Sequence, residues 1–175
     1  MTGLRFRDAR PGDRDAIRDL TLSAYQEYAA AMEGHWEDYL RNILATLADT
    51  TPAAQIIAEQ EGTMLGAVLL FPAGTVLTAP NGVQVAPTWP FVRLLAVALA
   101  ARGQGVGTAL MRECMRRARQ SGAAGLALHT SDPMQVALRI YERIGFVRAA
   151  EIDFHPAPGV TVKGYRYRFG EEAPS

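Results

Sequence analysis

The feature that most constrains this chain is a glycine-rich turn that joins an apolar run to an amphipathic helix within residues 95–110. Gly103, Gly105 and Gly107 stand at every second position, so side chains leave the backbone N–H groups of the turn uncovered. The helix that follows adds unpaired first-turn N–H groups and the positive end of its dipole. The sequence therefore predicts a strand–turn–helix unit that binds a phosphate or pyrophosphate group.

Hydrophobic periodicity and turn residues predict the remaining elements. We expect strands at 4–7, 54–59, 64–71, 91–97, 126–129, 146–154 and 160–169. Helices are expected from Asp13 to a break at Gly34, and over 35–48, 105–120 and 132–144. Asn81-Gly82 marks a small hairpin excursion inside the 72–90 connection. This order predicts an α/β (α+β) fold with a mixed, mostly antiparallel central sheet and helices on both faces.

Bulk properties limit the function classes. The 175 residues predict one domain over 1–175, with 171–175 as a frayed tail. Zero net charge gives no electrostatic argument for nucleic acid or for an anionic membrane. No apolar run approaches the ~20 residues of a membrane helix, and the single cysteine, Cys114, cannot form an internal disulfide. We expect a cytoplasmic protein that has no metal site.

Two well-known phosphate-binding turns do not fit residues 102–108. A P-loop ends in Gly-Lys-Ser/Thr because the lysine reaches the outer phosphates, whereas here Gly107 is followed directly by Thr108. A dinucleotide-binding turn needs Gly-x-Gly-x-x-Gly, and the third glycine position after Gly103 and Gly105 is again Thr108. What remains is Arg-x-x-Gly-x-Gly, which Arg102, Gly105 and Gly107 fill.

With this turn the chain resembles the GCN5-related N-acetyltransferase (GNAT) superfamily. A second motif supports the resemblance, because Ala137-Leu-Arg-Ile-Tyr141-Glu-Arg-Ile-Gly145-Phe146 looks like the family's Ala-x-x-x-Tyr-(three residues)-Gly-Phe. The resemblance extends over about 3–169 and implies a splay between the fourth and fifth strands of a GNAT-like sheet. It also implies an acetyl-CoA-dependent N-acyltransferase domain in which acetyl-CoA is the co-substrate.

The resemblance assigns the acetyl-CoA contacts to three consecutive strand residues and to the turn. The strand residues would offer main-chain groups to the pantetheine amides, and the turn would hold the pyrophosphate. The residues assigned in this way are Leu95, Ala96, Val97, Arg102, Gly103, Gln104, Gly105, Val106, Gly107 and Thr108.

The resemblance also implies two catalytic groups. The backbone N–H of Val97 would stabilise negative charge on the thioester oxygen, and Tyr141 would be the general acid that protonates the leaving thiolate. Without the motif, Tyr141 would be interpreted as a packing residue on the inner helix face.

The chain departs from the family pattern in two places. Met134 stands where an Asn often holds the pantetheine, with Gln135 or Ser131 as substitutes. The strand before the turn carries Phe91-Val92-Arg93 and lacks the glutamate that often serves as the general base. The remaining candidates for the base are Glu33, His35, Glu37, His129 and water.

The acceptor is expected to be a primary amine of a small molecule. Arg93 either faces solvent or meets a carboxylate on that acceptor. A shallow groove at 72–90 and 154–160 would favour a protein N-terminal or lysine acetyltransferase instead. The missing strand glutamate and Met134 support a third hypothesis, a catalytically inactive acyl-CoA-binding module. No nucleic-acid or membrane partner is expected, and the resemblance alone suggests a homodimer.

Overall fold

The computed structural model describes residues 3–32, 34–51, 53–78, 82 and 84–170. The expected frayed tail at 171–175 and Asn81 of the expected excursion lie outside these residues. The segments that flank the excursion pair as two short antiparallel strands, β4 (Leu77–Thr78) and β5 (Gln84–Val85). Within the described residues, no helix has both the length and the apolar character needed to cross a membrane.

One mixed sheet forms the centre of the molecule, with strand order β1-β2-β3-β6-β7-β10-β8. The hairpin of β2 (Ala54–Gln60) and β3 (Thr63–Phe71) is confirmed, and β1 (Arg5–Asp8) pairs antiparallel with β2. β6 (Phe91–Val97) and β7 (Gly125–Thr130) form a parallel pair, and β10 (Val160–Arg168) returns antiparallel to β7. The mostly antiparallel α/β fold expected from the sequence is therefore confirmed.

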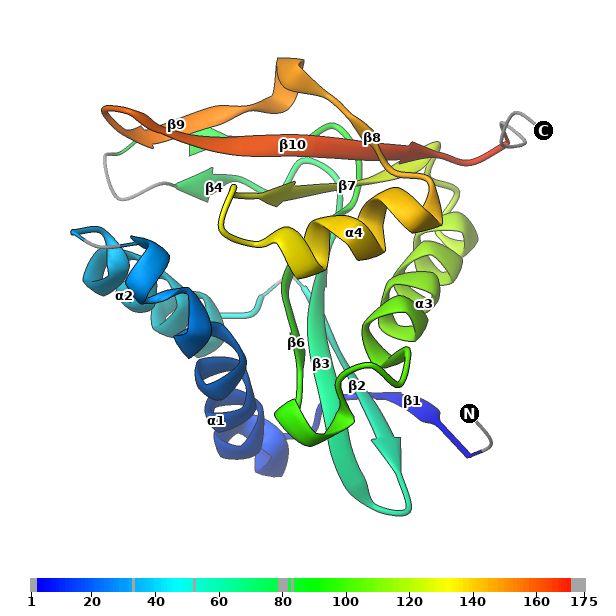
Figure 1. Ribbon diagram of the computed structural model, residues 1–175. Coiled ribbons are helices and arrows are strands. Elements are labelled where there is room, and N and C mark those ends of the chain that lie inside the picture. The colour runs from blue at the N-terminus through cyan, green and yellow to red at the C-terminus, as the bar shows by residue number, and fades with distance from the viewer. Residues whose placement is uncertain (1–2, 33, 52, 79–81, 83, 171–175) are drawn as a thin grey trace.

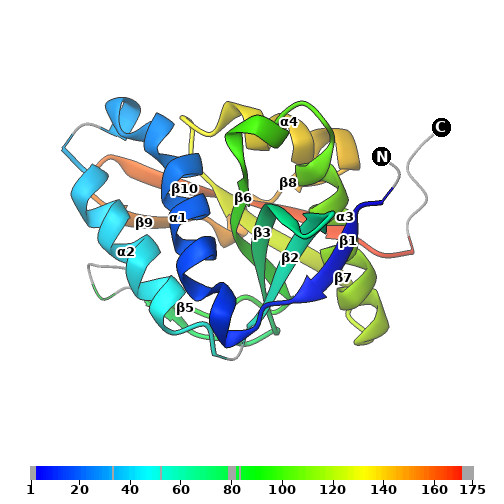
Figure 2. The same ribbon diagram turned by 90° about the horizontal axis from the view of Figure 1, so that it is seen from below.

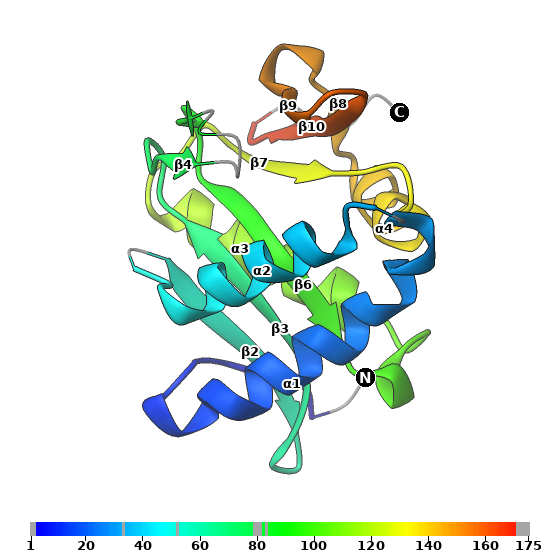
Figure 3. The same ribbon diagram turned by 90° about the vertical axis from the view of Figure 1, so that its left-hand side faces the viewer.

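In the described part of the chain, four α-helices cover the two faces of the sheet (Figures 1 and 2). Figure 3 shows α1 (Arg14–Tyr25) and α2 (Trp36–Ala48) in front of β2, β3 and β6, with α3 (Val106–Gln120) behind them. α4 (Gln135–Ile144) packs against α3. The core on this side is built from the apolar positions of α3 and the inward residues of the strands, including Ile56, Val68, Val92, Leu110 and Leu126.

Two of the expected helices are shorter than the sequence predicts. α1 ends at Tyr25, and two 3-10 turns, Gln26–Tyr28 and Ala30–Met32, replace the rest of the expected helix. In this arrangement the rings of Tyr25 and Tyr28 pack edge to face, with 5.8 Å between their centroids. The helix expected from 132 begins at Gln135, because the Asp132 carboxylate pairs with Lys163 Nζ at 2.5 Å and does not cap the helix.

The expected strand over 146–154 is interrupted. β8 (Val147–Arg148) is followed by a 3-10 turn at Ala150–Ile152, and only then by β9 (Phe154–Ala157), which pairs with β10. The interruption passes over Gly164, where a Cβ would come within 2.2 Å of the Ile152 side chain. Asp153 holds the detour in place, since its Oδ1 accepts from Gly164 N at 2.8 Å and from Arg148 Nη1 at 2.7 Å.

β6 and β7 pair over only two residues and then separate. The parallel register joins Phe91 to Ala127 and Val92 to Leu128. Beyond these pairs the two strands run apart at a wide angle (Figure 1). The main-chain groups of β6 that face this opening need other partners, because a peptide group shielded from water without one is costly. The opening therefore determines where a ligand can enter the sheet.

The start of α1 is fixed by Arg7 of β1. Arg7 donates to Glu59 on β2 at 2.8 Å and to both carboxylate oxygens of Asp13 at 2.7 and 3.0 Å. Asp13 also accepts from Arg10 N at 2.7 Å, closing the 3-10 turn that precedes the helix. The Arg7 guanidinium, and then the Arg10 N–H, lower the pKa of Asp13 from 3.8 to about 2.

We predict that Asp13→Ala lowers the free energy of unfolding by about 1–2 kcal/mol at neutral pH, as the loss of a capping side chain does. Because the folded pKa is depressed, this stabilisation is complete above the unfolded pKa of 3.8 and is lost as the pH falls through about 2. Urea unfolding should therefore show a gap between wild type and variant that narrows from about pH 4 downward. Asp15→Ala, which removes an exposed ion pair with Arg18, serves as the control with little effect. A gap that stays constant down to about pH 2 contradicts the role assigned to Asp13.

Candidate active site

A cavity of about 860 Å³ opens where β6 and β7 separate. Its wall combines the end of α1, α2, the second half of β6, the glycine turn, the start of α4 and the β9–β10 turn. The expected site residues that line it are Leu95, Val97, Arg102, Gly103, Gly105, Val106, Gly107, Thr108 and Tyr141. Two expected residues, Ala96 and Gln104, are not among the lining residues. Ala96 is 1% exposed and packs under α1 and α2, and the Gln104 amide donates to Ala100 O at 3.0 Å.

A β-bulge directs β6 along the cavity. Ala67 of β3 lies opposite Ala96 and Leu69 lies opposite Arg93, so Leu94 and Leu95 together face the single residue between them on β3. Leu94 has φ 51°, a left-handed conformation that is strained for a branched side chain. The bulge bends β6 at the level where its pairing with β7 ends.

The N–H group of Val97 points away from β3. Ala98 N donates to Leu65 O at 2.9 Å, and the register places Val97 opposite Gly66. Bonded and non-bonded pairs alternate in an antiparallel ladder, so the Val97–Gly66 pair is a non-bonded one. The Val97 N–H and C=O therefore face the opening between β6 and β7, where a ligand can reach them.

The glycines of the turn have separate roles. Gly105 has φ 80° and precedes α3, and no side chain caps the helix. The first-turn N–H groups of α3 are therefore available to an anion at the edge of the cavity. Gly107 allows a close approach, because a Cβ there would lie 3.1 Å from Ile140 Cδ1 and 3.5 Å from Val97 Cγ2.

Arg102 connects the glycine turn to the end of α1. Its guanidinium donates to Glu27 Oε2 at 2.6 Å and to Ala24 O at 3.1 Å. Burial, together with the charge of Glu27 and a hydrogen bond to it, raises the pKa of Tyr28 to about 12. The side chain of Arg102 thus positions the turn, and it remains at the cavity wall.

Tyr141 lies on α4 with 7% of its surface exposed. Its ring packs against Phe146 at 6.1 Å between centroids, just past the end of α4 at Gly145, where φ is 107°. The Gly-Phe part of the second motif thus ends the helix and supports the tyrosine. Burial raises the pKa of Tyr141 well above its ordinary value, and neighbouring Tyr25 and Tyr28 contribute. The phenol therefore keeps its proton over the whole physiological range.

The structure shows which of the residues named as possible general bases line the cavity. His129 lines the cavity, and its Nε2 lies 2.7 Å from Ile152 O. A carbonyl oxygen only accepts, so neutral His129 carries its proton on Nε2 and leaves Nδ1 unprotonated. Burial lowers the pKa of His129, which keeps the ring neutral at pH 7. His35 also lines the cavity, Glu37 does not, and Glu33 lies outside the described residues.

The residues near the expected Asn position also differ in their roles. Met134 is 8% exposed and packs with Ala24, Tyr25 and Ile43. Gln135 donates to Asp132 O at 2.6 Å and does not line the cavity. Ser131 lines it, and its buried hydroxyl has no hydrogen-bond partner among the described residues. Of the two substitutes named from the sequence, Ser131 is the one available to a ligand.

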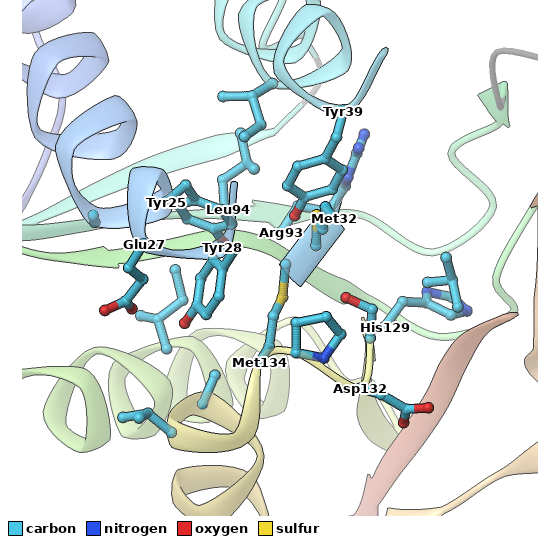
Figure 4. A pocket seen from close by; sticks show the side chains of 18 of the residues that line it. Tyr25, Glu27, Tyr28, Met32, Tyr39, Arg93, Leu94, His129, Asp132 and Met134 are labelled. Atoms are coloured by element: carbon cyan, nitrogen blue, oxygen red, sulfur yellow. The ribbon is translucent and has the colours of Figure 1, made fainter. Parts of the chain in front are cut away.

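The side of the cavity away from the glycine turn is formed by the two early helices, β4 and the β9–β10 turn. Figure 4 shows the rings of Tyr28 and Tyr39 and the Met134 side chain extending into the cavity, with Arg93 running alongside Tyr39 towards α2. Arg93 donates from Nη2 to Asn42 Oδ1 at 2.8 Å, so it does not point into bulk solvent. Alternation along β6 indicated that Arg93 shares a strand face with aromatic residues, but nothing in the sequence indicated its contact with α2.

Known proteins resemble the chain in sequence. The model of the acetyltransferase (GNAT) family matches residues 15–146. An acetyltransferase of Agrobacterium fabrum is 39% identical over 64 residues, which are 37% of this chain and 45% of that protein. A mycothiol acetyltransferase of Parafrankia is 35% identical over 120 residues, 62% of this chain and 36% of that protein. The chain thus spans less than half the length of these relatives.

Solved structures share the fold. A GNAT family acetyltransferase from Brucella melitensis, crystallised with acetyl-CoA, is 26% identical with a TM-score of 0.58, covering 99% of this chain and 93% of that one. A GNAT family acetyltransferase from Streptococcus agalactiae has a TM-score of 0.71 at 13% identity, covering 97% and 98% of the two chains. Because the family model spans most of the chain and the fold agrees, this chain belongs to the acetyltransferase (GNAT) family.

Proposed function

We propose that this protein is an N-acetyltransferase that moves an acetyl group from acetyl-CoA directly to a primary amine of a small molecule. The observation that carries the proposal is the convergence of three groups on one cavity. These are the uncapped start of α3 after the glycine turn, the outward N–H of Val97 and the buried phenol of Tyr141. Each corresponds to one requirement of acyl transfer from a pyrophosphate-bearing thioester.

The residues of the cavity fit acetyl-CoA. Val106, Gly107 and Thr108 would hold its pyrophosphate through their N–H groups, and the main chain of Leu95 and Val97 would pair with its pantetheine arm. The unpartnered Ser131 hydroxyl supplies a polar group at the opposite wall. When bound, acetyl-CoA supplies an activated acetyl group and a thiol leaving group.

The residues of this chain then stabilise charge and move protons. The Val97 N–H would donate to the oxygen on which negative charge develops. The Tyr141 hydroxyl would be the proton donor to the departing sulfur, because the phenol keeps its proton at physiological pH. Neutral His129, with an unprotonated Nδ1, is the cavity group best able to accept a proton from the amine.

The shape of the cavity favours a small acceptor over a protein. Leu77 and Thr78 of β4 and Phe154, Pro156 and Ala157 of β9 line the same cavity as the glycine turn. These hairpins therefore form a wall at the acceptor end, where a protein substrate would need an open groove.

We predict that acetyl-CoA raises the melting temperature of the wild-type protein, by about 5–10 °C at a hundredfold excess over its dissociation constant. Gly105→Ala should reduce this shift, because the left-handed conformation at φ 80° is strained for alanine and the N–H cradle depends on it. Gly62→Ala in the β2–β3 turn has a matching φ of 78° and is the control. It should lower the starting melting temperature similarly and keep the full acetyl-CoA shift. Absence of any shift in the wild type overturns the proposed function.

We also predict that Tyr141→Phe lowers the turnover number about 10²- to 10⁴-fold, as loss of a general acid does. The variant keeps the ring contact with Phe146, so the acetyl-CoA melting shift should not change. Tyr165→Phe is the matched control, because Tyr165 is equally buried at 7% exposed but does not line the cavity. Thiol release measured across a panel of primary amines provides the rates. Equal turnover by both variants would rule out the acid role of Tyr141.

A further inference from the structure

Arg93 is a shielded cation in the wall of the cavity. It follows the last β6 residue that pairs with β7 and precedes the bulge. Its Nη2 donates to Asn42 Oδ1 at 2.8 Å, which occupies one of the five N–H donors of the guanidinium. Burial lowers the pKa of Arg93, although a guanidinium stays charged at every physiological pH.

The groups that surround Arg93 carry no compensating charge. Asn42 is neutral, and the two phenols within electrostatic reach, Tyr25 and Tyr39, both have pKa values raised by burial and stay protonated. Across the described part of the chain, no carboxylate lies within ion-pair distance of Arg93. A shielded charge without a partner is costly, so its retention calls for a ligand that neutralises it.

The carboxylates of the cavity already have partners. Among the described residues, three carboxylates line it, and each pairs with a cation other than Arg93: Glu27 with Arg102 at 2.6 Å, Asp132 with Lys163 at 2.5 Å, and Asp38 with Arg41. Arg139 and Arg143 of α4 also line the cavity without an ion pair, but both are exposed to water. Of the lining residues that the structure describes, Arg93 is the shielded arginine that pairs with no carboxylate. The part of the cavity around Arg93 therefore presents an unpaired positive charge, among aromatic side chains such as Tyr39 and polar ones such as Asn42 and Thr78.

We propose that the acceptor is an amine that also carries a carboxylate, and that Arg93 binds this carboxylate while the amine faces the acetyl donor. This inference rests on the proposed function and narrows its substrate class. The planar fork of a guanidinium matches the two oxygens of a carboxylate. Arg93, Tyr39 and Tyr141 all line the same cavity, so the carboxylate subsite and the acid belong to one connected space.

The position of Arg93 separates this subsite from the phosphates of acetyl-CoA. Arg93 lies four residues before Val97 on β6, which corresponds to roughly 13 Å of extended strand at ~3.3 Å per residue. The glycine turn lies beyond the other end of the strand. Val97 thus stands between the anion site at the turn and the guanidinium at Arg93. The anion expected at Arg93 therefore belongs to the acceptor.

Isothermal calorimetry with a pair of isosteric probes tests the subsite without turnover. Phenylacetate carries the carboxylate, and phenylacetamide has the same shape without the charge. With CoA present, phenylacetate should bind wild-type protein about 10- to 100-fold more tightly than phenylacetamide, the range for hydrogen bonds to a charged group. Arg93→Met should remove the difference, and Arg18→Met on the exposed face of α1 should keep it. Equal binding of the two probes by the wild type overturns the inference.

The Asn42→Asp variant tests the role of the Arg93 charge while it keeps the arginine in place. The aspartate would place a carboxylate where Asn42 Oδ1 lies, 2.8 Å from Arg93 Nη2, and so give the guanidinium a partner inside the protein. The variant should fold with unchanged or higher stability and lose the preference for phenylacetate. Retained preference in a folded Asn42→Asp protein contradicts the inference. This arm is independent of whether Arg93→Met folds.

Turnover measurements complete the test of the carboxylate subsite at Arg93. Thiol release is compared for amino acids, their amides and their decarboxylated amines, with phenylalanine, phenylalaninamide and phenethylamine as one set. The carboxylate-bearing member of a set should have the highest kcat/KM, by at least about tenfold, and Arg93→Lys should reduce that ratio. Preference for the amide or the plain amine overturns the inference and leaves the proposed function intact. Failure of acetyl-CoA to bind overturns the proposed function, whereas the probe-binding result stands by itself.

Discussion

The short parallel contact between β6 and β7 is the constraint on which the site depends. Two paired residues, Phe91 and Val92, hold the two halves of the sheet together, and the Leu94 bulge then turns β6 away. A fully paired sheet would consume the main-chain donors of β6, whereas this one leaves the Val97 N–H facing the opening. The polar groups that the cavity offers are thus a consequence of incomplete pairing, and the surrounding helices keep that gap from closing.

The wall of the cavity is assembled from both ends of the chain. Arg102 reaches Glu27 and Ala24 at the end of α1, and Arg93 reaches Asn42 on α2. These contacts join the side of the cavity built around the glycine turn and α3 to the side built around α1 and α2. The strained φ of Leu94 lies between them, which fits the tendency of strained backbone to occur at functional sites.

Local signals in the sequence predicted the parts of the fold that depend on local chemistry. The β2–β3 hairpin follows from alternation around Glu61-Gly62, and α3 follows from its apolar periodicity after the glycine turn. The late start of α4 and the detour at 149–153 depend on contacts with β10, through Lys163 and Gly164, that no local pattern encodes. The glycine turn and Tyr141 were predictable because motifs mark them. The partner of Arg93 was not, because Asn42 lies 51 residues away.

The two helical layers rest on separate sets of buried residues. α3 and α4 share a core with the strands that includes Leu110, Cys114 and Tyr141, while α1 and α2 pack around Tyr25 and Ile43 on the other face. The two sets meet at Ala137, which packs against both, so substitutions in the second set reach the first through this contact. In a chain built in this way, the wall formed by α1 and α2 can change over evolutionary time while the turn before α3 keeps its geometry. That wall is the part of the cavity that is freer to diversify.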